Sequence, residues 1–179
     1  MTVQFKTIYD ETSAGLRQTP ENATAVFSAQ TRQVDGFRSE VALRQFNLTV
    51  DEPETLGGTD RGPTPVELLL AALGSCQEIT YRLYADALGI PLTGVSVRLT
   101  GNLDLRGFFA VDPEVRPGYQ SIAATVVLDS PASDADLARL KEIVDRHCPV
   151  LDILASPTPV ELKLERGVTA VRQETWSAA

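Results

Sequence analysis

Cysteine and histidine are scarce in this sequence, and their scarcity limits the chemistry that the chain can carry. Its 179 residues include only two cysteines, Cys76 and Cys148, and one histidine, His147. Because a structural zinc site needs four Cys or His ligands, one copy of the chain cannot supply it. Nothing in the spacing suggests a carboxylate-rich metal site, so we expect no metal and no cofactor. The motif C-x-x-C is absent, which argues against a thioredoxin-type site.

Positive charge is also in short supply. The chain has 16 Lys and Arg against 24 Asp and Glu, which gives a formal net charge of −8 at pH 7. The arginines are scattered and form no basic run. Since phosphate binding needs clustered Lys and Arg, we expect no nucleic-acid partner.

Long hydrophobic runs are missing too. No segment approaches the roughly 18 apolar residues of a membrane helix, and the first residues, MTVQFKTIYDET, contain no apolar signal core. We therefore expect a cytoplasmic protein without a membrane partner. In a reducing compartment, two cysteines are more typical of catalytic, redox-active or core residues than of a structural disulfide.

The most regular stretch that the sequence does contain is residues 64–89, TPVELLLAALGSCQEITYRLYADALG. A T-x-x-E capping box with Glu67, and Pro65 at the first helical position, predict the start of a long helix. Gly89, followed by Pro91, predicts its end. Residues 68–73 are apolar on all sides, so we expect them to be enclosed. Cys76 lies near the middle of this helix.

The remaining elements predict an α+β fold, because the strands are grouped before and after the helices. Strands are expected at 25–32 and 37–50, with a hairpin at Asp35-Gly36 and a bulge or bend at Arg44-Gln45. Further strands are expected at 95–105, around 122–128 and around 160–164. A helix capped by Ser133 should end at Cys148-Pro149 and be followed by a short helix at 150–154. We divide the chain into an N-terminal arm (1–22, with a short helix before Pro20), a main domain (23–166) and a tail (167–179).

The two cysteines allow more than one interpretation. Free Cys is among the most buried residue types, so both could be small core residues. Cys148 precedes a helix and follows Arg146-His147, where a thiolate is favoured. Cys76, in mid-helix, would need a cation from elsewhere. His147 is poorly placed to act as a base for its neighbour Cys148, although it could serve Cys76.

Three features together resemble the OsmC/Ohr family of thiol peroxidases: the segment GPTPVELLLAALGSC, the strand block after it, and the second cysteine in HCPV, 72 residues after the first. The resemblance spans roughly residues 24–165. It implies an intertwined homodimer in which two central helices pack back to back, with antiparallel six-stranded sheets wrapped around them. It also implies that Cys76 is the peroxidatic cysteine and Cys148 the resolving one.

The sequence departs from the family pattern at two positions. The family places a Glu directly after the Pro of the motif, paired with an Arg from the first strands. Here that position is Val66, and Glu67 follows, for which we favour the capping-box role. For the arginine we prefer Arg38 over Arg32 and Arg44.

The resemblance predicts an antioxidant enzyme that reduces organic hydroperoxides through a Cys76 sulfenic acid and a Cys76–Cys148 disulfide, which an external dithiol then reduces. We expect Cys148 to be held close to Cys76. An apolar pocket around Leu69, Leu73 and the LGG loop would favour alkyl or lipid peroxides. The alternative is a non-enzymatic small-molecule-binding or redox-sensing protein with an apolar pocket at the dimer interface. A Cys76 pKa below that of free cysteine would favour the enzyme, and a raised pKa the alternative.

Overall fold

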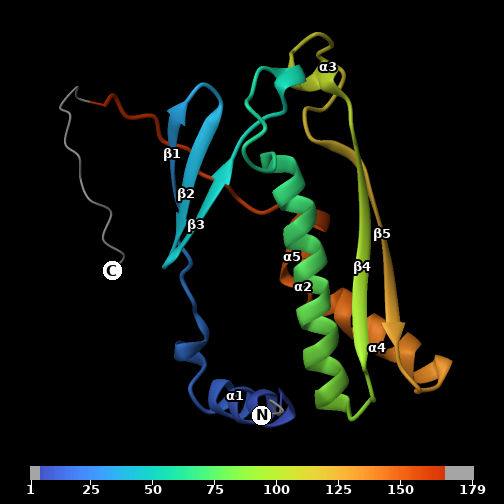
Figure 1. Ribbon diagram of the computed structural model, residues 1–179. Coiled ribbons are helices and arrows are strands. Elements are labelled where there is room, and N and C mark those ends of the chain that lie inside the picture. The colour runs from blue at the N-terminus through green and yellow to red at the C-terminus, as the bar shows by residue number, and fades with distance from the viewer. Residues whose placement is uncertain (1–4, 168–179) are drawn as a thin grey trace. The chain divides into compact units, whose positions relative to one another are not determined.

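The computed structural model describes residues 5–167 and has the α+β fold that the sequence predicts (Figure 1). The described residues form two compact units, one of 5–24 with Val66–Ala155 and the other of Ala25–Pro65 with 156–167. All strand pairs are antiparallel. The predicted tail, 167–179, lies outside the described residues except for Gly167. In the described part of the chain, no helix has the length and apolar character needed to cross a membrane.

The first unit is built on the long helix α2 (Pro65–Leu88), as predicted. Its C-terminus is closed by Gly89, whose φ of +69° suits glycine. The Gly89 N–H donates to the Asp86 carbonyl (3.2 Å) and the Ile90 N–H to the Ala85 carbonyl (2.8 Å). These two bonds form a Schellman motif, which satisfies carbonyls that would otherwise lack partners.

A two-stranded ribbon of β4 (Gly94–Leu103) and β5 (Tyr119–Asp129) runs alongside α2 (Figure 1). Its register extends from Gly94 opposite Asp129 to Leu103 opposite Tyr119. Gly74 permits a close approach of α2 to β4, because a Cβ there would lie 2.9 Å from Leu99 Cδ1. The alternation of apolar and polar residues in the sequence predicted both strands of this ribbon correctly. The connection contains a short helix that the sequence did not reveal, α3 (Leu105–Phe108), capped by the Asp104 side chain.

Two helices near the C-terminus complete the core of this unit. Helix α4 (Asp134–His147) begins at Ser133, whose hydroxyl accepts a hydrogen bond from the Asp136 N–H (3.2 Å). Cys148 is extended (φ −78°, ψ 111°), as expected for a residue before proline, and α5 (Pro149–Ala155) follows. The core joins α2, α4 and the turn after α2 through six buried side chains: Tyr81, Ala85, Ile90, Leu92, Leu140 and Val144.

The N-terminal segment forms helix α1 (Phe5–Gln18) and the 3₁₀ helix η1 (Pro20–Ala23), which agrees with the predicted helix ending before Pro20. Tyr9 of α1 contacts the edge of the Tyr84 ring on α2, with ring centroids 5.8 Å apart. This contact attaches α1 to the first unit.

The second unit contains a three-stranded sheet of β1 (Gln30–Asp35), β2 (Arg38–Leu43) and β3 (Phe46–Val50). The hairpin at Asp35-Gly36 is confirmed, with Gly36 at φ +51°. The single strand expected at 37–50 is wrong. Arg44 has a φ of 54° and reverses the chain, so the switch of side-chain parity marks a second hairpin turn. The first strand also begins at Gln30, later than predicted.

The loop at 51–63 includes the 3₁₀ helix η2 (Glu54–Leu56) and is organised by a buried carboxylate. Asp51 accepts hydrogen bonds from the N–H groups of Glu52 (2.9 Å), Thr59 (3.1 Å) and Arg61 (3.2 Å), and from the Thr59 hydroxyl (2.6 Å). These bonds, led by the Thr59 hydroxyl, lower the pKa of Asp51 to about 2. The loop that precedes α2 is therefore folded around one charge.

The strand expected around 160–164 does not form. Residues 156–167 are irregular, and Val160, Leu162 and Leu164 are exposed. Alternation makes a segment suitable for a strand, but the segment also needs a neighbour for its backbone N–H and C=O groups. Within the described residues this segment has no such neighbour, because the two sheets contain only β1–β3 and β4–β5.

Enclosure of residues 68–73 is only partly achieved by one copy of the chain. Leu73 is buried, but Leu69 is 37% exposed, and Ala71 and Ala72 are exposed as well. Further along α2, Ile79 is 69% exposed. A single chain therefore leaves one side of this apolar helix accessible.

Candidate functional site

The two cysteines meet inside the first unit, as the sequence predicts. Cys76 comes from the middle of α2, and Cys148 from the junction of α4 and α5. Their Sγ atoms are 3.3 Å apart, and the Cys148 thiol donates to the Cys76 sulfur. Both thiols are free, Cys148 fully buried and Cys76 half-buried. A disulfide has an S–S distance of about 2.05 Å, so only a small displacement separates the reduced pair from a bond.

The junction holds Cys148 by backbone hydrogen bonds on both sides. Its N–H donates to the Val144 carbonyl at the end of α4 (2.9 Å), and its carbonyl accepts from the Asp152 N–H of α5 (3.0 Å). Pro149 opens α5, where a missing N–H costs nothing. Cys148 thus belongs to a fixed chain reversal and not to a free loop.

The surroundings of Cys76 have opposing effects on its thiolate. Burial raises the pKa of the Cys76 thiol, and this is the largest effect. A hydrogen bond from the Val150 backbone N–H lowers the pKa, the neighbouring Cys148 thiol raises it, and the Thr80 hydroxyl, the last of these effects in size, lowers it. The net direction is upward, and none of these contributions comes from a cation. The first unit by itself therefore favours the neutral thiol.

Sequence reasoning missed the roles of Val150 and Thr80. The signal for Val150 was present in Cys-Pro-Val, because a proline that opens a helix leaves the next N–H without a partner inside the helix. Thr80 lies one turn after Cys76, and its hydroxyl also donates to the Cys76 carbonyl (2.7 Å). Nothing in the sequence distinguishes that threonine from other polar residues of the helix.

His147 lies in an aromatic cluster. Its ring stacks on Tyr84 of α2, with centroids 5.5 Å apart and an angle of 30° between the planes. Tyr84 in turn contacts Tyr9 of α1. The structure therefore gives His147 a packing role beside the Cys148 junction.

The other candidate residues are found in different settings. Arg38 is on β2 in the second unit, where its guanidinium lies 3.8 Å from the Asp35 carboxylate. In the same unit, Arg44 lies over the Phe46 ring at 5.3 Å. Glu67 is in the first turn of α2, and its charge, after burial, contributes to the raised pKa of Tyr119.

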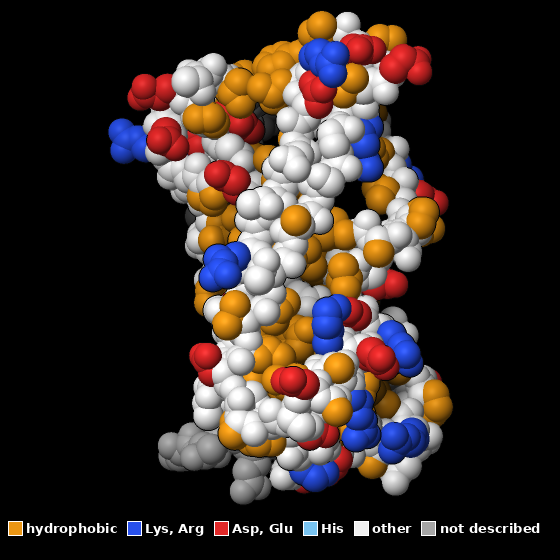
Figure 2. All heavy atoms as spheres, turned by 90° about the vertical axis from the view of Figure 1, so that its right-hand side faces the viewer, with side chains coloured by type: hydrophobic (Ala, Val, Ile, Leu, Met, Phe, Trp, Pro, Cys, Tyr) orange, Lys and Arg blue, Asp and Glu red, His pale blue; other side chains and the backbone are white. Residues whose placement is uncertain are grey.

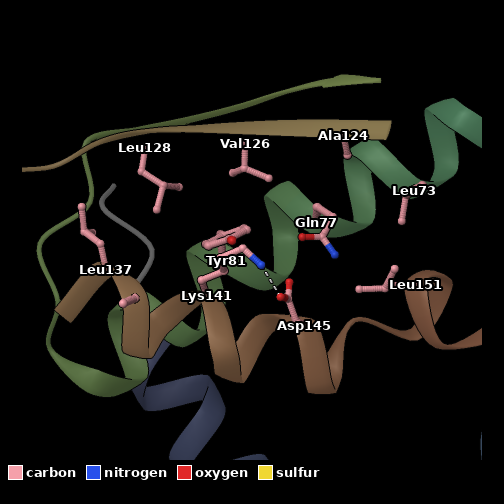
Figure 3. Close-up of a pocket in the computed structure, with 11 residues that line it drawn as sticks. Leu73, Gln77, Tyr81, Ala124, Val126, Leu128, Leu137, Lys141, Asp145 and Leu151 are labelled. Carbon is pink, nitrogen blue, oxygen red and sulfur yellow. Dashed lines mark hydrogen bonds and ion pairs between the residues drawn. The ribbon is translucent and has the colours of Figure 1, made fainter. Parts of the chain in front are cut away.

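The first unit also contains a cavity of about 570 Å³ next to α2 (Figure 3). Leu73, a residue of the expected apolar pocket, lines it, and the other walls come from β5, α4 and α5. Among the described residues, no group of three or more His, Cys, Asp or Glu side chains could hold a metal ion.

The fold and this site define a class of protein: an α+β chain that brings two free thiols into contact between a central helix and a Cys-Pro junction. The profile of the OsmC family, described as OsmC-like protein, matches residues 58–163. The chain belongs to this family. No curated protein matches it.

Solved structures show the same fold. An OsmC-like protein from Mycoplasma pneumoniae is 20% identical, with 74% of this chain and 89% of that chain covered and a TM-score of 0.65. An organic hydroperoxide resistance protein OsmC from Legionella pneumophila is 20% identical, with coverage of 73% and 91% and a TM-score of 0.57. An organic hydroperoxide resistance protein from Elizabethkingia anophelis is 16% identical, with coverage of 75% and 91% and a TM-score of 0.56.

Proposed function

We propose that this protein is a thiol-dependent peroxidase that reduces organic hydroperoxides. The observation that carries the proposal is the 3.3 Å contact between the Cys76 and Cys148 sulfurs, in a chain of the OsmC family. Proteins of this fold from Legionella pneumophila and Elizabethkingia anophelis are named organic hydroperoxide resistance proteins, which supports the choice of substrate.

In the first step, the Cys76 thiolate attacks the terminal oxygen of the hydroperoxide. The O–O bond breaks, an S–O bond forms, and the leaving alkoxide takes a proton to become an alcohol. Cys76 is oxidised to a sulfenic acid. Cys76 is the nucleophile in this scheme because it is partly accessible, whereas Cys148 is fully buried.

In the second step, the Cys148 sulfur attacks the Cys76 sulfenic sulfur. An S–S bond forms and water leaves, carrying the hydroxyl of the sulfenic acid and the proton of the Cys148 thiol. The fixed junction that holds Cys148 supports this step, because the attacking atom is already near its target. Resolution then precedes over-oxidation of Cys76.

In the third step, an external dithiol reduces the disulfide by thiol–disulfide exchange and restores both thiols. This requirement agrees with a reducing compartment, and we propose the cytoplasm. The protein itself needs no cofactor in this cycle.

Cys76 needs a cation in this proposal, since its surroundings within the first unit raise its pKa. We assign that role to Arg38. Glu67, in the first turn of α2, lies one residue after the position at which the family has a glutamate, and we propose it as the acidic residue of the site. Arg38 is partly exposed on β2, where its guanidinium lies 3.8 Å from the exposed Asp35 carboxylate. Such a weak surface pair would yield readily to a thiolate.

We further propose that the protein is a homodimer. One copy leaves apolar side chains of α2 exposed, above all Leu69 and Ile79. Around α3, Leu105, Phe108, Phe109 and Val111 are exposed as well. On the face shown in Figure 2, hydrophobic side chains are exposed among acidic and basic ones. An isologous dimer would bury such surfaces on both copies at once.

The test of the enzymatic proposal is turnover of cumene hydroperoxide with a dithiol reductant. The native protein should consume the peroxide, and Cys76→Ser should not. If the native protein consumes the peroxide no faster than Cys76→Ser does, the proposal is wrong.

A second candidate is a non-enzymatic small-molecule-binding or redox-sensing protein. The raised pKa of Cys76 and the valine at the family's glutamate position favour it. This candidate predicts no turnover, together with a Cys76 thiol that stays neutral at physiological pH.

A further inference from the structure

The cavity beside α2 is separate from the cysteine pair. Neither Cys76 nor Cys148 lines it. Its volume of about 570 Å³ lies within the range of roughly 300–1,000 Å³ that is usual for small-molecule sites. Most of the wall is apolar, from α2, β5, α4 and α5: Leu73, Val126, Leu128, Leu137 and Leu151.

One buried polar side chain points into this apolar space. Gln77 is only 5% exposed, and its amide projects from α2 toward the gap between Ala124 and Leu151 (Figure 3). The amide carries two N–H donors and one C=O acceptor, so it can accept a hydrogen bond from an occupant or donate one to it.

Tyr81, one turn further along α2, supplies a second polar group. Burial, and then the charge of Asp145, raise the pKa of Tyr81 to about 12. Its hydroxyl therefore stays protonated and neutral at physiological pH. Gln77 and Tyr81 stand four residues apart on one helix face, so both can reach the same polar group of an occupant.

The charges at the cavity cancel. Lys141 and Asp145 line the cavity from α4 and form an ion pair with each other (Figure 3). An anionic occupant would meet Asp145, whose field already reaches the Tyr81 hydroxyl, and a cationic one would compete with Lys141. The electrostatics therefore select a neutral occupant.

The polar groups lie between two apolar ends. Along α2, Leu73 precedes Gln77 by one turn and lies with Leu151 at one end, whereas Leu128 and Leu137 lie at the other (Figure 3). We infer that this cavity is a binding site for a neutral molecule with an amide- or ester-like group between two hydrocarbon arms. The Gln77 amide would pair with the polar group, and the leucines would cover the arms.

The experiment titrates Cys76→Ser protein with N-butylhexanamide and measures binding by calorimetry. This variant carries out no peroxide chemistry, so the result is independent of the proposed peroxidase function. Saturable binding is expected, with decanoate and dibutylammonium at least about tenfold weaker because each carries a charge. Gln77→Leu, which keeps the side-chain volume, should weaken binding of the amide about fivefold or more.

Ala124→Leu fills the cavity from β5 and should abolish binding, whereas Thr125→Leu, at the adjacent exposed position of the same strand, should leave it unchanged. Equal binding of the charged probes would overturn the inference. So would unaltered binding to Ala124→Leu, or no saturable binding at all, as expected if a second copy of the chain covers the cavity.

Discussion

At the scale of single residues, Cys76 is where the chemistry is decided. Its sulfur is stabilised as a thiolate by the Val150 N–H and Thr80, but burial outweighs both. A thiolate is the reacting species in peroxide reduction, in alkylation and in disulfide exchange. The ease with which Cys76 loses its proton therefore separates an enzyme from an inert core thiol.

We expect Arg38→Gln to shift the pH dependence of Cys76 alkylation. Without the cation, burial should place the midpoint above that of free cysteine, and alkylation should keep rising as pH increases. The native midpoint should be lower by about 1–3 pH units, the usual effect of an opposite charge nearby. The measurement is the iodoacetamide rate against pH in the Cys148→Ser background, with Arg32→Gln as the matched control. Equal midpoints in native and Arg38→Gln protein would favour the binding or sensing candidate.

Asp51 gives a second prediction at this scale. Its folded pKa of about 2 lies below its unfolded value of about 3.9, so the folded state is favoured by the ionised form. That contribution is fully present above about pH 4 and is lost as the pH falls toward 2. Asp51→Asn should lower the denaturation midpoint at pH 7 and flatten its acid dependence between pH 4 and 2. Asp10→Asn, which removes only an exposed ion pair with Lys6, should change stability by a few tenths of a kcal/mol. An acid dependence identical to that of native protein would contradict this account of the loop.

At the scale of elements, the helix ends and turns were the most predictable features. Pro65 and Gly89 mark the ends of α2, and Ser133 and Cys148-Pro149 mark the ends of α4. Each acts on the backbone next to it, Ser133 through its hydroxyl and the others through their own backbone geometry. Such signals are local, so the sequence carries them completely. Two of the errors concern strand pairing. The turn at Arg44 has no glycine or proline, and the expected strand around 160–164 depends on a neighbour that local alternation cannot reveal.

Of the site, the cysteine pair could be predicted from the sequence, but the cavity could not. The Cys76–Cys148 pair follows from the family pattern and from the rigid Cys-Pro junction. The cavity with Gln77 was not predictable, because a polar residue in an apolar helix looks the same whether it faces solvent or a buried space.

One pair of substitutions compares the glycine that caps α2 with a glycine inside α1. Gly89→Ala places a Cβ at φ +69° and should destabilise the protein by about 1–2 kcal/mol. Gly15→Ala, inside α1 with open space around the added Cβ, should stabilise that helix by about 0.5–1 kcal/mol. Urea denaturation followed by circular dichroism measures both. The account of the α2 cap fails if the two changes have the same sign.

At the scale of the whole molecule, the exposed side of α2 is the reason to expect assembly. A helix that is apolar on most of its surface must be covered, and one copy of the chain leaves Leu69 and Ile79 exposed.

We therefore expect Ile79→Asp to convert a dimer into monomers at micromolar concentration, because a buried unpaired carboxylate costs several kcal/mol. Sedimentation velocity measures the change. Ser96→Asp, which adds the same charge at an exposed strand position, should remain dimeric. A native protein that sediments as a stable monomer would rule out the proposed dimer.

The central claim, that Cys76 and Cys148 form one redox site, is tested most directly by a brief pulse of organic hydroperoxide followed by mass spectrometry. We predict that both free thiols disappear together, with an intramolecular Cys76–Cys148 disulfide and no covalently linked dimer on a non-reducing gel. Cys148→Ser should instead accumulate Cys76 sulfenic acid and then its sulfinic form. If the pulse leaves both thiols intact, or links Cys76 to another chain, the two-cysteine mechanism is wrong.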